Sequence, residues 1–80
     1  MQRYYFDLRD GDALQTDEEG RDLSSFEAMQ EEATISLAEI ALDAVAKCGA
    51  GHRMSLEVRD IRGPVLRVNC TFEVERIRRA

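Results

Sequence analysis

Residues 25–48 read SFEAMQEEATISLAEIALDAVAKC, and this stretch is long and periodic enough to form a helix of several turns. A serine side chain accepts hydrogen bonds from the amides of a first helical turn. Ser24 is therefore predicted as the N-cap, with Glu27 as its reciprocal partner. After the stretch, Gly49 and Gly51 can adopt the left-handed conformation that ends helices. The sequence predicts one helix over residues 25–48, and we place the rest of the chain around it.

The predicted helix has a continuous apolar face. At 100° per residue, eight side chains fall on one stripe, which should cover a sheet. They are Phe26, Met29, Ala33, Leu37, Ile40, Ala41, Ala44 and Cys48.

A second, thinner apolar line runs along almost the opposite side of this helix. Its members are Ala28, Ile35, Ala38, Leu42 and Ala46, with Val45 toward its side. A helix lying on a single sheet would expose this line to water, and scattered exposed apolar residues are normal. The second interpretation is a self-association seam, because Ile35 and Leu42 are one heptad apart and have small alanines beside them.

The segments on either side of the helix alternate with the period of two that is typical of strands buried on one face. Strands are predicted over residues 3–9 and 13–16 before the helix, and over residues 54–59 and 66–75 after it. The polar residues 17–22 are predicted to be a surface loop. The clearest alternation is in the last strand, whose buried face would hold Leu66, Val68, Cys70, Phe72 and Val74.

These elements follow the order β-β-α-β-β, in which an antiparallel sheet has one face in water and one face under the helix. We therefore predict an α+β fold, a two-layer sandwich with one long helix packed on an antiparallel sheet. Residues 1–80 should form a single domain. A core of this size is marginal, and dimerisation would add to it.

Charge is distributed unevenly along the chain. Residues 1–48 hold four basic and twelve acidic side chains, whereas residues 49–80 hold seven basic and four acidic ones. The overall net charge of −5 argues against indiscriminate nucleic-acid binding. A basic patch in the second half could contact phosphate, or equally an acidic face of a second copy. Its members would be Arg53, Arg59, Arg62, Arg67, Arg76, Arg78 and Arg79.

Metal sites are not expected. An EF-hand loop beginning at Asp10 would need an oxygen ligand and a glycine where Leu14 and Gln15 stand. Cys48 and His52 supply too few ligands for a zinc site. We predict that the chain holds no metal and no cofactor.

Catalysis and disulfide formation are not expected either. His52 is the sole histidine, and no nucleophile stands at an informative spacing from it. Cys48 and Cys70 are interpreted as small buried hydrophobic residues. We predict a protein that is not an enzyme and has no small-molecule substrate.

The solvent face of the predicted sheet carries alternating arginine and glutamate residues, and Tyr5 is its one aromatic side chain. RNA-binding sheets usually present several stacking aromatics, so ladders of charged pairs are the simpler interpretation. The longest uncharged run, residues 33–38, is too short to span a bilayer, and residues 1–4 lead into a strand pattern. We expect a cytoplasmic protein that does not enter the membrane.

Several short motifs follow one another along the chain in a recognisable order. They are Arg3 to Gly11, Asp17 to Leu23, Ala28, Ala33, Val58 to Asp60 and Pro64 to Leu66. In these motifs the chain resembles a family of short proteins of unknown function from rhizobia and related alphaproteobacteria. Members open with an Arg-Tyr-Phe-Phe-Asp-like strand and an Asp-Gly turn, continue with Asp-x-Glu-Gly and a helix with paired alanines, and then have a Val-Arg-Asp and Pro-Val-Leu hairpin. The resemblance implies a bacterial cytoplasmic protein and carries over no catalytic residue.

A weaker similarity, at the level of the fold, is to the HicB-like antitoxin domain, which also passes from strands through an acidic glycine-containing loop into a Glu/Ala-rich helix. Two hypotheses therefore stand. The first is a non-enzymatic interaction or regulatory module, most simply a homodimer or a module with another protein partner. The alternative is a HicB-like antitoxin or a nucleic-acid-associated regulator.

Overall fold

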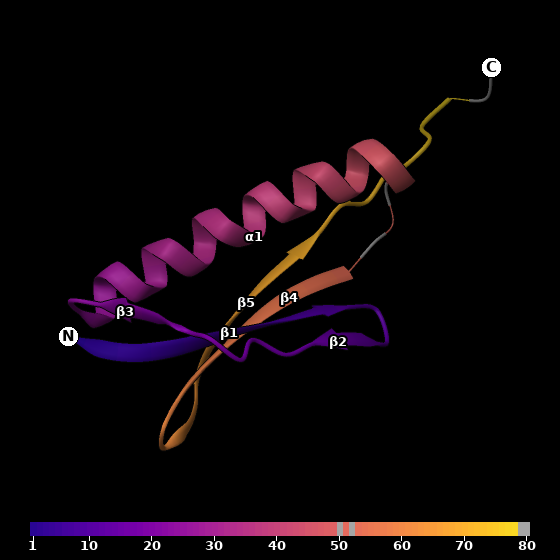
Figure 1. The fold of residues 1–80 in the computed structure, drawn as a ribbon. Coiled ribbons are helices and arrows are strands. Elements are labelled where there is room, and N and C mark those ends of the chain that lie inside the picture. Colours follow the sequence, from indigo (N-terminus) through magenta and orange to yellow (C-terminus); the bar gives the residue numbers. More distant parts are fainter. Residues whose placement is uncertain (50, 52, 79–80) are drawn as a thin grey trace.

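The computed structural model describes residues 1–49, 51 and 53–78, and these form one helix on one sheet (Figure 1). Strands β1 (Gln2–Asp10), β2 (Ala13–Gln15) and β3 (Arg21–Leu23) precede the helix α1 (Phe26–Cys48). Strands β4 (Arg53–Asp60) and β5 (Gly63–Thr71) follow it. The predicted α+β sandwich with an antiparallel sheet is confirmed.

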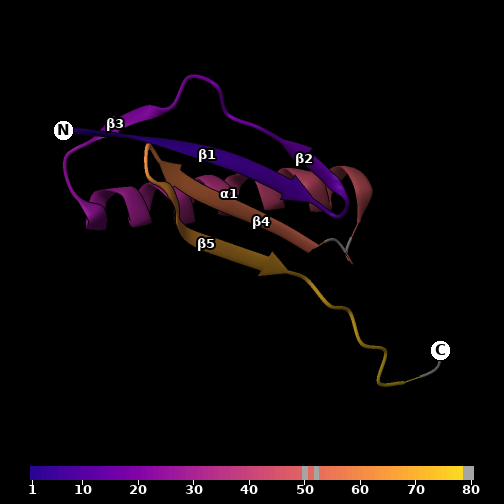
Figure 2. The same ribbon diagram turned by 90° about the horizontal axis from the view of Figure 1, so that it is seen from below.

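The sheet has the order β2-β1-β4-β5, and β3 pairs with the other end of β1 on the same edge as β2. All of these pairings are antiparallel. The short β2 and β3 therefore share one edge of the sheet, while β5 forms the opposite edge (Figure 2). The tight turn between β1 and β2 contains Gly11, whose φ of 61° suits glycine.

The core lies between α1 and the face of the sheet beneath it. Its buried side chains come from the helix, from β1 and from β4. They are Met29, Ala33, Leu37 and Ala41; Tyr4 and Phe6; and Met54, Leu56 and Val58.

Two members of the predicted core stripe are not buried: Phe26 is 48% exposed, and Cys48 is also exposed. The cause is length. A helix of 23 residues spans about 34 Å, whereas the eight residues of β4 span about 26 Å. The ends of α1 therefore extend past the strand beneath its middle, and the first and last apolar positions of the stripe contact water.

The helix begins one residue later than the predicted cap requires. The N-cap is Ser25, whose side chain accepts from the Ala28 amide at 3.0 Å, and Ser24 does not have this role. At the other end Gly49, with φ of 82°, donates its amide to the Val45 carbonyl, as predicted for a glycine stop.

The last strand is shorter than predicted. β5 ends at Thr71, which pairs with Arg53, the first residue of β4. Beyond this point β4 offers no further residue to pair with, so the alternating residues 72–75 continue as an extended segment (Figure 2). Phe72 and Val74 are 43% and 83% exposed, and their predicted burial is wrong.

Two further observations complete the fold. β3 is a strand within the part of the chain predicted to be a loop, because Gln2 to Tyr4 of β1 pair with it. Within the described ranges 1–49, 51 and 53–78, no helix has the length and apolar character needed to cross a membrane.

Candidate functional site

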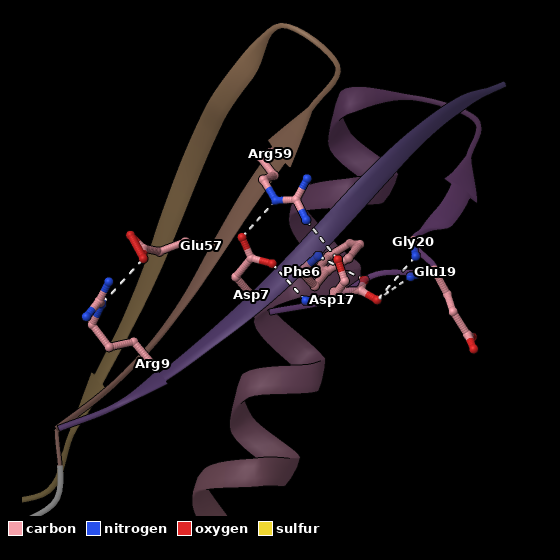
Figure 3. A network of polar contacts seen from close by, with 8 residues as sticks. All are labelled: Phe6, Asp7, Arg9, Asp17, Glu19, Gly20, Glu57 and Arg59. Carbon is pink, nitrogen blue, oxygen red and sulfur yellow. Dashed lines mark hydrogen bonds and ion pairs between the residues drawn. The ribbon is translucent and has the colours of Figure 1, made fainter. Parts of the chain in front are cut away.

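The solvent face of β1 and β4 carries a polar network centred on Arg59 (Figure 3). Its guanidinium donates from Nε to the Asp7 carboxylate at 2.9 Å and from a terminal nitrogen to the Asp17 carbonyl at 2.8 Å. It also stacks over the Tyr5 ring, 4.5 Å from the centroid. Arg59 thus joins β4 to β1 and to the segment between β2 and β3.

Asp17 fills the gap that β2 and β3 leave along the edge of β1. β2 pairs with Leu8 to Asp10 and β3 pairs with Gln2 to Tyr4, so the Phe6 amide has no strand beside it. The Asp17 carboxylate accepts from this amide at 3.1 Å, and the Asp17 amide donates to Asp7 at 2.9 Å. One aspartate therefore takes the place of the missing strand residue. The Phe6 amide at this edge of the sheet consequently has a hydrogen-bond acceptor.

The same carboxylate also organises its own loop. Its second oxygen accepts from the amides of Glu19 at 3.1 Å and Gly20 at 3.2 Å. Burial acts to raise the pKa of Asp17, but the amides of Phe6, Gly20 and Glu19, with the nearby charge of Arg21, together lower it below the ordinary value. Asp17 is consequently held in its ionised form.

Gly20 is required where this loop meets β1. Its φ is 76°, and a Cβ placed on it would lie 2.9 Å from the Tyr4 carbonyl oxygen. Any other residue would therefore meet both an unfavourable backbone conformation and a clash with backbone. The loop can approach β1 closely because glycine stands at this position.

A second group of charges surrounds Glu57 on β4. Its carboxylate accepts from Arg67 of β5 at 2.9 Å and pairs with Arg9 of β1 at 3.5 Å. These arginines lower the pKa of Glu57, Arg67 most strongly through its hydrogen bond, while burial opposes them. The ladders of opposite charge predicted for the solvent face are present.

The predicted basic residues lie in different parts of the structure. Arg59 and Arg67 stand on the sheet face, each with an acidic partner. Arg53 begins β4, Arg62 is exposed in the hairpin between β4 and β5, and Arg76 and Arg78 lie in the exposed segment after β5. Arg79 lies outside the described residues.

The predicted seam lies on the outer side of α1. Ile35 and Leu42 are 49% and 71% exposed, Ala38 and Ala46 are also exposed, and Ala28 is half-buried. Acidic, exposed side chains lie beside the line: they are Glu31, Glu39 and Asp43, of which Asp43 pairs with Lys47 at 3.1 Å. The outer face of the helix is therefore an apolar line bordered by negative charge.

An open groove of about 510 Å³ separates α1 from the segment that joins β2 to β3. Its lining includes the apolar side chains of Leu8, Ile40 and Leu56 and the acidic residues Asp17 and Glu18. Arg21 also lines the groove; its guanidinium lies 5.0 Å from the Phe6 ring centroid and pairs with Glu32 of the helix. The groove explains why Leu8 and Ile40 are only half-buried.

The two cysteines are free, and their predicted burial is wrong for Cys48, which is exposed, while Cys70 is half-buried. In the described part of the chain, no three His, Cys, Asp or Glu side chains come together as a metal site would require. His52 lies outside the described residues.

A family model for a domain of unknown function, DUF6894, matches residues 3–71, which run from β1 to the end of β5. The chain belongs to the DUF6894 family. No curated protein and no solved structure matches it. The DUF6894 match ends at Thr71, so the extended segment after β5 lies outside it.

Sequence reasoning missed the role of Asp17 and Gly20 in this DUF6894 chain, since it assigned both to a solvated loop. A signal was present. Aspartate side chains commonly accept from backbone amides two or three residues later, and a glycine at the third position favours such a turn. What the local sequence does not show is that the same carboxylate reaches Phe6, eleven residues away in the chain.

Proposed function

We propose that this DUF6894 chain is a non-enzymatic protein-interaction module that associates with a second copy through the outer face of α1. The seam consists of Ala28, Ile35, Ala38, Leu42 and Ala46. The observation that carries the proposal is the exposure of Ile35 and Leu42 on one line, on a helix whose opposite side is in the core. Contiguous exposed apolar surface, in contrast to singly scattered residues, marks contact surfaces.

The composition of the seam supports a second copy as the occupant. Ile35 and Leu42 are spaced as a heptad, and the alanines between and beyond them let another helix approach closely. A helix-on-sheet core of 80 residues is small, and burial of this line would add to it. The same surface therefore serves recognition and stability.

The acidic border makes the association dependent on salt. A two-fold helix pair would bring Glu31 and Glu39 of both copies close together, while Asp43 is paired with Lys47 of its own helix. Like charges at the surface repel, and salt screens them over about 8 Å at physiological ionic strength. Association through the seam should tighten as salt is raised.

The test replaces the two large side chains of the seam by charged ones. Ile35→Glu/Leu42→Glu should lower the solution mass measured by light scattering, with an unchanged circular dichroism spectrum. The matched control is Gln30→Glu/Thr34→Glu, which adds the same two charges at exposed positions off the seam and should leave the mass unchanged. An unaltered mass in the seam variant would refute this surface.

The HicB-like or nucleic-acid-associated regulator remains the alternative prediction. The two arginines of the sheet face that would contact phosphate, Arg59 and Arg67, are each paired with a carboxylate. Their pairing favours the protein-interaction module over a nucleic-acid-binding protein. Fluorescence anisotropy with labelled RNA and DNA at low salt tests it. Salt-dependent binding that is lost on Arg59→Glu/Arg67→Glu would support the alternative, and absence of binding would remove it.

A further inference from the structure

The two edges of the sheet differ in how far other strands cover them. The outer edge of β1 is covered by β2 and β3, each of three residues, and Asp17 satisfies the amide between them. β5 has nine residues, and among the described residues no strand pairs with its outer edge (Figure 2). Long, uncovered edge strands are where another chain can add to a sheet.

The backbone groups at this edge can be assigned. The Phe72 carbonyl accepts from Gly51, which lies on the β4 side. Backbone donors and acceptors alternate in direction along a strand, so those of Arg67, Asn69 and Thr71 point away from β4. The side chains of Arg67 and Asn69 lie on the solvent face, where they contact Glu57 and Ser55.

The segment after β5 has the pattern of a strand without a partner. Phe72, Glu73, Val74 and Glu75 continue the apolar and polar alternation of β5. The segment is extended and exposed, and it runs on from the end of β5 (Figure 1). Apart from the Phe72 carbonyl, which accepts from Gly51, no strand among the described residues pairs with this segment, so a strand of another chain can add to it.

We propose that β5 and this segment pair antiparallel with the same residues of a second copy, with the two-fold axis at Cys70. The pairs nearest the axis are matched. On the helix side Leu66 faces Val74 and Val68 faces Phe72; on the solvent side Arg67 faces Glu73 and Asn69 faces Thr71. The outward-pointing residues oppose one another, as hydrogen-bonded antiparallel pairs require.

The neighbouring registers are poorer. A shift of the pairing by two residues in one direction places Arg76 against Leu66, although it pairs Arg67 with Glu75. A shift in the other direction places Thr71 against Arg67, so the opposite-charge pair is lost. Cross-strand pairs of apolar residues and of opposite charges stabilise a sheet, and mismatched pairs lack this stabilisation. The chosen register also covers the half-buried Leu66 and Val68 with Val74 and Phe72 of the second copy.

A charge reversal tests the pairing. Glu73→Arg places a positive charge opposite Arg67 of the second copy and should raise the dissociation constant about tenfold. Glu75→Arg is the matched control, because it makes the same change two residues farther along the same face, where Val65 stands opposite. It should have a smaller effect, and equal dissociation constants for the wild type and Glu73→Arg would contradict the proposal.

A disulfide test decides the register. Cys70 would face its own copy in a non-hydrogen-bonded pair, where Cα atoms are about 4.5 Å apart, within the range that a disulfide spans. In Cys48→Ser, mild oxidation with diamide should convert most of the protein to a covalent dimer on a denaturing gel. In Cys70→Ser it should not, and equal yields in the two variants would overturn the proposal.

These measurements are separable from those on the seam. Glu73→Arg and the Cys48→Ser cross-link are repeated in the Ile35→Glu/Leu42→Glu background. The sheet pairing predicts that this background is still a dimer, that it is still cross-linked through Cys70, and that Glu73→Arg raises its dissociation constant about tenfold. Failure of the seam alone therefore leaves these results unchanged, and failure of the sheet pairing abolishes them.

Discussion

Asp7 lies directly opposite Glu57 in the ladder between β1 and β4, so two carboxylates face each other on the solvent side of the sheet. Like charges at directly opposed positions destabilise a sheet. Each carboxylate has its own arginine: Arg59 lies 2.9 Å from Asp7, and Arg67 lies 2.9 Å from Glu57. The two arginines therefore offset the repulsion between the two carboxylates on this face of the sheet.

Arg59→Ala should destabilise the fold by about 1–3 kcal/mol, because it removes charged hydrogen bonds and leaves Asp7, whose side chain is 14% exposed, facing Glu57. Urea unfolding at neutral pH measures this. The control is Arg62→Ala in the exposed hairpin, which should change the free energy of unfolding by less than about 0.5 kcal/mol. Equal losses of unfolding free energy in the two variants would show that the Arg59 network does not stabilise the fold.

Asp17→Ala should expose the Phe6 amide, since this substitution removes its acceptor in the gap between β2 and β3. We expect faster hydrogen exchange at Phe6 and a loss of about 1–3 kcal/mol in the free energy of unfolding. Glu18→Ala, at an exposed position in the same loop, is the control. Unchanged protection of the Phe6 amide in Asp17→Ala would contradict the assigned role.

Lowering the pH should destabilise the fold. The pKa values of Asp17, Asp22 and Glu57 are lowered in the fold, that of Asp22 chiefly by its hydrogen bond from Arg3. Their stabilisation is complete above the unfolded-state values of about 3.9 for aspartate and 4.3 for glutamate, and is lost as the pH falls through the lower folded values. The melting temperature should therefore fall below about pH 4, and less steeply in Asp17→Asn. An identical pH dependence in the two proteins would contradict this.

Gly20→Ala should lower the free energy of unfolding far more than Gly11→Ala does, although both glycines have positive φ angles. A Cβ at Gly11 meets nothing within 4 Å, so the cost there is the backbone conformation, about 1–2 kcal/mol. At Gly20 the Cβ also meets the Tyr4 carbonyl, and the loop must move away from β1. Thermal unfolding of the two variants checks the order, and similar melting temperatures would argue against the close approach.

The sequence predicts the parts of this fold that depend on periodicity. Met29, Leu37 and the alternating residues of β4 are buried as the pattern indicates, because helix and strand periods determine which side chains share a face. Limits set by length are not visible in the pattern, so Phe26 and Val74 are exposed where a partner strand has ended.

Contacts between distant residues were also beyond sequence reasoning. The pairing of β3 with Gln2 to Tyr4, and the reach of Asp17 to Phe6, depend on how the chain folds back and not on local preference. For the outer helix face, the sequence indicated the exposed line of Ile35 and Leu42. The open edge of β5 became visible only with the strand order.

The most direct test of self-association is the solution mass measured by light scattering over a dilution series at low and high salt. We expect the wild type to exceed the monomer mass of 9.1 kDa and to dissociate on dilution, and the Ile35→Glu/Leu42→Glu variant to form smaller assemblies. A wild-type mass of 9.1 kDa at every concentration and salt would contradict the account.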